Sequence, residues 1–329
     1  MALPTSFFLW PKANFPRSLD YVAGSAGCEK IEARLAQLFP GSVPVLFSSA
    51  RAAINAVLEH IGLTRPDFLW LPEFSSHCVL DTVAHVCTPT PVMGEKINAA
   101  IVYHQWGFEH QAEFYKDVVL LEDSVDSLFI PGTSPFAIGG RYAFWSLPKV
   151  LGTLAGGVVF CQFATDASAL RHIRSNRPDS YIQAALRLAS YSSRMASLYW
   201  NGAESQQGGL IAPFRRQIWR ALEEIEQTVE ERMGVLKQVL GEGADAFTKS
   251  GRLPSNLPLT IPEGWEKLWA PEARLSAGLR YFNTSRTCPQ SHWAKVAPLP
   301  VHRDISQNVI AETLSTLNLE EGQIELAII

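Results

Sequence analysis

The sequence lacks the features that mark several other classes of protein. Its five cysteines are odd in number, scattered and never spaced as C-x-x-C: Cys28, Cys78, Cys87, Cys161 and Cys288. This pattern argues against a disulfide framework and a structural zinc site, and it fits a reducing compartment. The histidines show no metal-ligand spacing, so no metal is expected.

Charge and long apolar runs are also scarce. Charged residues make up 18% of the chain, and the net charge is −4 with no basic stripe, so nucleic acid is not expected as a partner. No apolar run has the ~20 residues that a membrane-spanning helix needs. The apolar stretch near the N-terminus is interrupted by prolines, and no basic segment precedes it. We therefore expect a cytoplasmic protein without a membrane partner.

Apolar residues are abundant. They make up 47% of the 329 residues, including nine tryptophans and seventeen phenylalanines, which predicts a large buried core and little disorder. The length suits two ordinary domains, or one large domain with an appendage.

The first two-thirds of the chain alternate between short β-rich runs and helical stretches. This alternation predicts an α/β fold, with a mostly parallel sheet that carries helices on both faces. The predicted strands are residues 43–47, 68–71, 99–103, 118–121, 142–145 and 157–161. The predicted helices are residues 28–39, 50–61, 75–86, 164–175 and 181–200.

A break rich in Gly, Gln and Ser at residues 201–209 precedes a long helix, predicted from about Phe214 to Leu240 by its apolar spacing. Strands at 257–261 and 277–281 and a helix from about 305 to 317 follow. We place the domain boundary in the long helix. Residues 1–217 would form a large domain, and residues 218–329 the connecting helix and a smaller C-terminal α+β domain.

Polar residues follow several predicted strands: Ser48 and Ser49, Glu73, His104, Asp123 and Lys149. In open α/β sheets, ligands bind at the carboxyl ends of the strands, so these residues are candidates for a site.

Three of these groups match the requirements of a pyridoxal phosphate (PLP) enzyme, which needs an amine for a Schiff base, an acid for the pyridine nitrogen and a phosphate site. Lys149 has apolar neighbours, and desolvation is expected to lower the pKa of its amine. Asp123 ends an apolar strand, where a carboxylate needs a cation such as a pyridinium. Ser48 and Ser49 precede a helix whose N–H groups and dipole favour phosphate, and Arg51 adds charge.

Each residue alone has a simpler interpretation. A strand-terminal Asp is commonly a turn residue, Ser-Ser before a helix is commonly an N-cap, and a lysine among aromatics commonly extends to solvent. Ser146 to Lys149 also matches the S-x-x-K of serine acyl-enzymes, but residues 249–251 are only a partial K-T-G and no S-D-N exists. The order of the residues along the chain favours PLP.

Several short segments carry that order. Residues 47–53 (F-S-S-A-R-A-A) are similar to S-S-G-T-A-A, residues 71–76 (L-P-E-F-S-S) to V-P-S-F-T-F, and residues 103–107 (Y-H-Q-W-G) to V-H-L-Y-G. Residues 121–124 (L-E-D-S) are similar to I-E-D-A, and residues 298–302 (P-L-P-V-H) to L-P-L-H. Residues 144–149 (F-W-S-L-P-K), followed by Gly156-Gly157, are similar to S-F-x-x-T-K followed by G-G. Together they resemble the DegT/DnrJ/EryC1/StrS family of sugar aminotransferases, PLP enzymes of fold type I.

The resemblance implies roles for individual residues. Lys149 would be the Schiff-base lysine and Asp123 the partner of the pyridine nitrogen. The segment Ser48, Ser49, Ala50 and Arg51 would hold the phosphate. The family completes its active site across a homodimer interface, so a homodimer is implied.

The sequence departs from the family pattern around the cofactor. Ala50 and Arg51 replace Gly and Thr, and Asp126 stands where Gln or His is usual. Phe144 replaces a serine, although Ser146 lies close by. Ser76 occupies the position of a ring-stacking aromatic, which leaves Phe74 or His77 to cover the ring. The G-x-N-x-R motif of the second subunit is not recognisable.

We therefore expect a PLP-dependent aminotransferase that moves an amino group from an amino acid to a nucleotide-linked keto-sugar, with Lys149 as general base and acid. Two alternatives remain open. One keeps PLP but changes the reaction, to dehydration or to an amino-acid substrate. The other is a non-catalytic homologue that retains the fold as a binding module.

Overall fold

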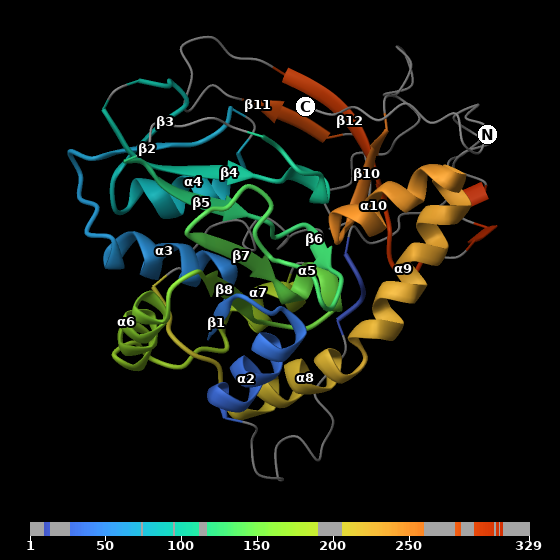
Figure 1. Cartoon of the computed structure of the whole chain (residues 1–329), viewed down its shortest axis with the longest axis horizontal. Helices are drawn as coiled ribbons and strands as arrows, with labels where there is room; N and C mark the ends of the chain where they lie inside the picture. Colours follow the sequence, from blue (N-terminus) through green and yellow to red (C-terminus); the bar gives the residue numbers. More distant parts are fainter. Residues whose placement is uncertain are drawn as a thin grey trace.

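The computed structural model describes residues 10–13, 27–73, 75–94, 96–111, 117–189, 206–259, 280–283, 293–305, 307–308 and 310–311. A seven-stranded sheet lies at the centre of this part of the chain, in the order β1-β8-β7-β5-β4-β2-β3 (Figure 1). Its strands are β1 (Val43–Phe47), β2 (Phe68–Trp70), β3 (Thr88–Thr90), β4 (Ile97–Tyr103), β5 (Val119–Asp123), β7 (Tyr142–Ser146) and β8 (Gly157–Cys161).

The strands run parallel except at β8, which is antiparallel to both β1 and β7. The central strands read as continuous apolar runs because helices cover both faces of the sheet. In the β4–β5 register, Tyr103 is opposite Asp123, so both side chains lie on the same face. This register brings together two residues that are 20 positions apart in the chain.

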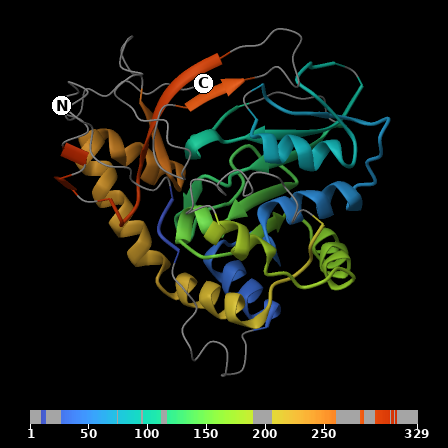
Figure 2. The ribbon, with the colours of Figure 1, turned by 180° about the vertical axis from the view of Figure 1, so that it is seen from behind.

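Helices α3 (Ala50–His60), α4 (His77–Ala84) and α6 (Ala164–Ser175) pack on one face of the sheet, around Phe47, Leu121 and Phe144. Helices α2 (Cys28–Leu38) and α8 (Ala212–Glu223) pack on the other face, where they lie beside each other in both views (Figures 1 and 2). The sheet thus has an apolar core on each side, as the alternation of elements predicted.

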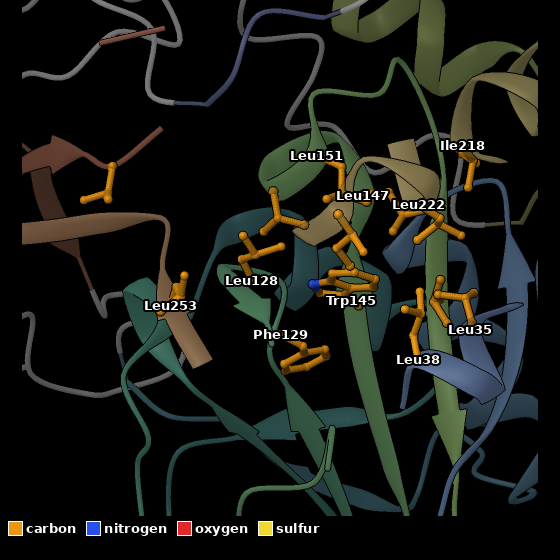
Figure 3. Packing of buried hydrophobic residues seen from close by; sticks show 14 of the residues in the cluster. Leu35, Leu38, Leu128, Phe129, Trp145, Leu147, Leu151, Ile218, Leu222 and Leu253 are labelled. Atoms are coloured by element: carbon orange, nitrogen blue, oxygen red, sulfur yellow. The ribbon is translucent and has the colours of Figure 1, made fainter. Parts of the chain in front are cut away.

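The second of these cores is centred on Trp145. Figure 3 shows this side chain among apolar residues that include Leu35 of α2, Leu147 of α5 (Leu147–Leu151) and Leu222 of α8. Its ring stacks on that of Phe129, with the ring centroids 5.3 Å apart, and its Nε1 donates a hydrogen bond to a backbone carbonyl. The core thereby satisfies the polar atom of its largest aromatic residue.

The long helix predicted from Phe214 to Leu240 is wrong in one respect, because the chain breaks it at Glu224. Helix α8 ends there, and α9 (Ile225–Leu240) begins in a new direction. The break follows from different packing partners: α8 lies on α2, whereas α9 lies on strand β9 (Arg252–Pro254). The apolar spacing continues through the break, so it did not signal the change of direction.

Smaller elements complete the described part. Strand β6 (Ser127–Phe129) pairs with β9, and a second sheet has the order β10-β12-β11. These three strands are β10 (Asn256–Leu259), β11 (Arg280–Asn283) and β12 (Trp293–Pro300). The remaining helices are α7 (Ile182–Ala189), α10 (Asp245–Ser250) and the short 3₁₀ turns η1 (Gln105–Gly107) and η3 (Gly241–Ala244).

The other predicted helices are observed in the described residues, with differences at some of their ends. Helix α6 has its predicted bounds, whereas α4 is shorter than the predicted 75–86. The predicted helices 181–200 and 305–317 extend outside the described residues. The core around Trp145 includes residues on both sides of the predicted boundary at 217 and 218. Among the described residues, no helix is both long and apolar enough to cross a bilayer.

Candidate active site

A cavity lies at the carboxyl ends of β4, β5 and β7, where the sheet order predicts a ligand site. Tyr103 ends β4, and both it and Asp123 of β5 line the cavity. Six of the residues predicted from the sequence line it: Ala50, Arg51, Ser76, Asp123, Ser146 and Lys149.

Lys149 reaches the cavity from α5, a short helix that follows β7 directly. Pro148 supports the first turn of this helix, and Gly152 ends it with a left-handed φ of 67°. The lysine Nζ lies 2.9 Å from Oδ1 of Asp126 and 5.3 Å from the ring centroid of Trp10. Both contacts favour the ammonium form of the side chain.

The pKa expected for Lys149 from its sequence surroundings is therefore wrong in direction. Burial acts to lower the pKa of this amine, but the charges of Asp126 and Asp123 outweigh burial and hold it above its ordinary value. The apolar neighbours were visible in the sequence, whereas the closeness of two carboxylates was not.

Asp123 is 2% exposed. Burial raises its pKa to about 7; the ammonium of Lys149 opposes this rise and the charge of Asp126 adds to it. One carboxylate oxygen accepts a hydrogen bond from the backbone N–H of Val125. A buried carboxyl group with so high a pKa is well placed to share a proton with a basic nitrogen.

Asp126 lies just after β5 and is 4% exposed. Its two oxygens have different donors: Oδ1 accepts from Lys149, and Oδ2 accepts from the hydroxyl of Tyr103. Burial and the charge of Asp126 raise the pKa of the Tyr103 phenol, which keeps it a donor. Tyr103 was missed as a site residue, although its place at the end of a strand was a usable signal.

The predicted phosphate segment lies where β1 leads into α3. Ser49 is the N-cap of α3, and its Oγ accepts a hydrogen bond from the N–H of Ala52 at 3.0 Å. The Ser48 side chain is fully buried, and its Oγ has no hydrogen-bond partner among the described residues. Ala50 and Arg51 line the cavity from the first turn, where the helix dipole is positive.

The Gly156-Gly157 pair brings β8 against this segment. Gly156 has a φ of 116°, and its N–H donates to the carbonyl of Ser48 and to Oε1 of Gln183. A Cβ on Gly157 would lie 2.1 Å from the backbone nitrogen of Ala50. Only glycine permits this approach, which explains the G-G that follows the lysine.

The remaining predicted residues differ in their surroundings. Ser146 and Ser76 line the cavity, and the Ser76 Oγ lies 2.9 Å from the Sγ of Cys78. His77 is exposed at the start of α4, and it is not among the residues that line the cavity. Phe74 lies outside the described residues. Gln183 of α7 also lines the cavity, and no motif in the sequence pointed to it.

His104 and Glu73 do not join this cavity. His104 is fully buried, with its Nε2 2.9 Å from Oε2 of Glu122. That hydrogen bond offsets burial and lowers the pKa of Glu122. Glu122 also accepts hydrogen bonds from the N–H groups of Ala137 and Gly140, so this pair supports the structure next to the site. Glu73 is exposed.

The residues present fit PLP. The Lys149 side-chain nitrogen lies at the cavity wall, and Asp123 is a buried carboxyl group whose charge a pyridinium would offset. Ser48 adds a buried hydroxyl at the start of α3. Amine, acid and helix N-terminus at the carboxyl ends of a mostly parallel sheet define the class of fold type I PLP-dependent enzymes.

The particular family follows from sequence comparison. The family model described as "Putative PLP-dependent aminotransferase" matches residues 31–318, and the chain belongs to this family. The predicted enzyme class and cofactor are thereby confirmed. No curated protein sequence matches the chain.

Solved structures show the same fold. The PMP form of "Putative sugar aminotransferase Spr1654" from Streptococcus pneumoniae is 11% identical, with a TM-score of 0.59, and the match covers 95% of this chain and 98% of that one. NtdA from Bacillus subtilis with bound PMP is 10% identical, with a TM-score of 0.62 and coverage of 92% and 79%. A DegT DnrJ EryC1 StrS aminotransferase from Brucella abortus is 13% identical, with a TM-score of 0.52 and coverage of 91% and 93%. The predicted fold type and the resemblance are confirmed.

Proposed function

We propose that this aminotransferase moves an amino group from an amino acid to a keto-sugar that is linked to a nucleotide. Lys149 would be the Schiff-base lysine, and Asp123 would hold the pyridine nitrogen protonated. PLP supplies the electron sink that makes the Cα–H bond of the donor acidic. Lys149 would then move the proton between the substrate Cα and C4′ of the cofactor.

The observation that carries the proposal is the meeting of three groups at one cavity. The Lys149 amine, the buried carboxyl group of Asp123 and the first turn of α3 all line it. A lysine alone would be consistent with many roles. An amine and an acid with a pKa of about 7, next to a helix N-terminus, are the groups that amino transfer through PLP requires.

Other residues would complete the binding of the cofactor. The phosphate would be held by Ser48, Ser49, Ala50 and Arg51. The charge of Arg51 would replace the hydroxyl contact that the family's threonine makes at this position. Ser146 and Ser76 would provide hydroxyls at the cavity wall. We further propose that Phe74 or His77 covers the ring face.

The sugar substrate is the finer part of the proposal. It is supported by the order of the family motifs and by the similarity of fold to Spr1654, whose description names a sugar aminotransferase. We also propose that the protein is a cytoplasmic homodimer, and that a second copy completes the phosphate site.

The test is a pair of half-reactions with purified protein loaded with PLP. Glutamate should convert the absorbance of bound PLP to that of the amine form, and a nucleotide-linked keto-sugar should convert it back. The Lys149→Ala variant should carry out neither conversion at a comparable rate, whereas the exposed-site variant Glu226→Gln should match wild type.

Three results would count against the proposal. Protein that takes up no PLP would overturn the cofactor roles given to its residues. Conversion by glutamate, without return by any keto-sugar, would leave an aminotransferase with another acceptor. No conversion by any amino acid would point to a different PLP reaction.

A further inference from the structure

Two departures from the family pattern contact each other at the cavity. Tyr103 stands where the family segment V-H-L-Y-G begins with Val, and Asp126 stands where Gln or His is usual. In the folded chain, the Tyr103 hydroxyl donates to Oδ2 of Asp126, while Oδ1 accepts from Lys149. A carboxylate suits this position because it offers one acceptor oxygen to each of two donors.

An amide would not reproduce this arrangement. Asn or Gln has a single acceptor oxygen for the ammonium, so its NH₂ group would have to donate to the phenol oxygen, and the negative charge beside the lysine would be lost. The Tyr103 and Asp126 substitutions are therefore matched, and the tyrosine fixes the carboxylate in the position that the lysine needs. Asp126 is buried and the Lys149 side chain is 16% exposed, so water competes little for the carboxylate.

We propose that Asp126, oriented by Tyr103, is a positioning residue that holds the Lys149 side chain as an ammonium at the wall of the cavity. Whenever this lysine is free of a covalent partner, the ion pair favours the form that donates a proton over the free amine that accepts one. The inference rests on the proposed function in that it takes Lys149 as the reactive amine.

Other charged and titratable groups surround the same amine. Asp123 adds negative charge from β5, but Asp126 is the group in direct contact. Cys78 of α4 and Arg51 of α3 share the cavity wall with the lysine. Arg187 lies over the Trp10 ring, which the lysine also approaches. Of these groups, Asp126 is the one with an oxygen 2.9 Å from Nζ, so its charge dominates.

The test measures the protonation of Lys149 directly, without reference to activity. Full-length protein stripped of PLP is labelled briefly with acetic anhydride across a pH series, and the peptide that contains Lys149 is quantified by mass spectrometry. In Asp126→Asn the pH midpoint of labelling should fall by about one unit or more. Labelling below the midpoint should then be roughly tenfold faster than in wild type.

Three further variants separate the effect of charge from that of packing. Tyr103→Phe removes one hydrogen bond but neither charge, so its midpoint should fall by less than half as much. Glu226→Gln removes an exposed negative charge from α9 and should leave the midpoint unchanged. Asp126→Glu, which restores the charge, should return the midpoint most of the way to wild type.

The inference is overturned if the Asp126→Asn midpoint coincides with that of wild type, or if Tyr103→Phe shifts it equally. Circular dichroism of each variant checks that a shift does not come from unfolding. If Asp126→Asn unfolds, Asp126→Gln, which also removes the charge, takes its place in the comparison. Wild-type protein that takes up no PLP would defeat the proposed function, but the labelling profile would still decide the role of Asp126.

Discussion

At the scale of single residues, burial acts with opposite signs on the groups of the cavity. It raises the pKa of the Asp123 carboxyl group to about 7. It also acts to lower the pKa of Lys149, and there the two neighbouring carboxylates prevail. The site therefore keeps a neutral or proton-sharing acid beside a positively charged amine, and both groups depend on Asp126.

The raised pKa of Asp123 predicts a pH dependence of stability in protein stripped of PLP. A carboxyl group with a folded-state pKa above its unfolded value binds more protons when folded, so stability is lost as the pH rises from about 4 to 7. Asp123→Asn removes this loss. As the pH rises from about 4 to 7, the free energy of unfolding of the variant should increase relative to that of wild type by up to about 4 kcal/mol.

Urea unfolding followed by fluorescence at both pH values measures this difference. Asp117→Asn, at an exposed position, is the matched control and should show no pH-dependent difference from wild type. If the difference between Asp123→Asn and wild type were the same at both pH values, the raised pKa would be refuted.

At the scale of elements, the site depends on how closely β8 approaches the start of α3. Phe47 pairs with Gly157 across the antiparallel β1–β8 ladder, and Gly156 donates to the carbonyl of Ser48. The backbone of residues 48–50, in the proposed phosphate segment, is therefore positioned by a strand that follows Lys149 in sequence. This contact links the segment that carries Lys149 to the start of α3.

Gly157→Ala should disturb that contact. The added Cβ would lie 2.1 Å from the nitrogen of Ala50, which is backbone and cannot rotate away. We expect a loss of about 1–3 kcal/mol of stability and a weaker affinity for PLP. The measurements are the urea midpoint and a titration of the stripped protein with PLP.

Gly234→Ala is the matched control for this substitution. Gly234 lies within α9 and is exposed, and the added Cβ would meet no described atom within 4 Å apart from the backbone of its own helix. Its replacement should raise stability by about 0.5–1 kcal/mol and leave PLP affinity unchanged. Equal behaviour of the two alanine variants would show that the close approach of β8 is unimportant.

Much of this arrangement was predictable from the sequence, for a physical reason. Strands β1 and β8 have their predicted bounds, because apolar runs bounded by turn or helix-capping residues define short buried strands. Lys149 and Asp123 were predicted as candidates because they lie at or just after the ends of such strands, and both line the cavity. The Tyr103–Asp126 pair was not, since it depends on side chains that only the β4–β5 register and the turn after β5 bring together.

At the scale of the whole molecule, the two apolar cores fix the sheet between its layers of helices. The core around Trp145 extends from α2 to α8 and α9, so the helix break at Glu224 lies within one continuous packing unit. Such a core gives α5, and with it Lys149, a rigid support. The break was not predictable, because both helices keep an apolar face.

The proposed homodimer is testable at this scale. Sedimentation velocity at micromolar concentration should give a mass near twice the 36.4 kDa of the chain, for wild type and for Lys149→Ala alike. Dilution should reduce the amino-transfer rate per chain once the dimer dissociates, because a second copy would complete the phosphate site. A monomer with full activity would contradict this part of the proposal.

The central claim is that Lys149 is the lysine that carries the cofactor. Reduction of PLP-loaded protein with borohydride, followed by digestion and mass spectrometry, tests it most directly, because reduction fixes the cofactor to the nitrogen that holds it. The account predicts a phosphopyridoxyl group on the peptide that contains Lys149, and none in Lys149→Ala. Modification of a different lysine, or of no lysine in protein that has bound PLP, would contradict it.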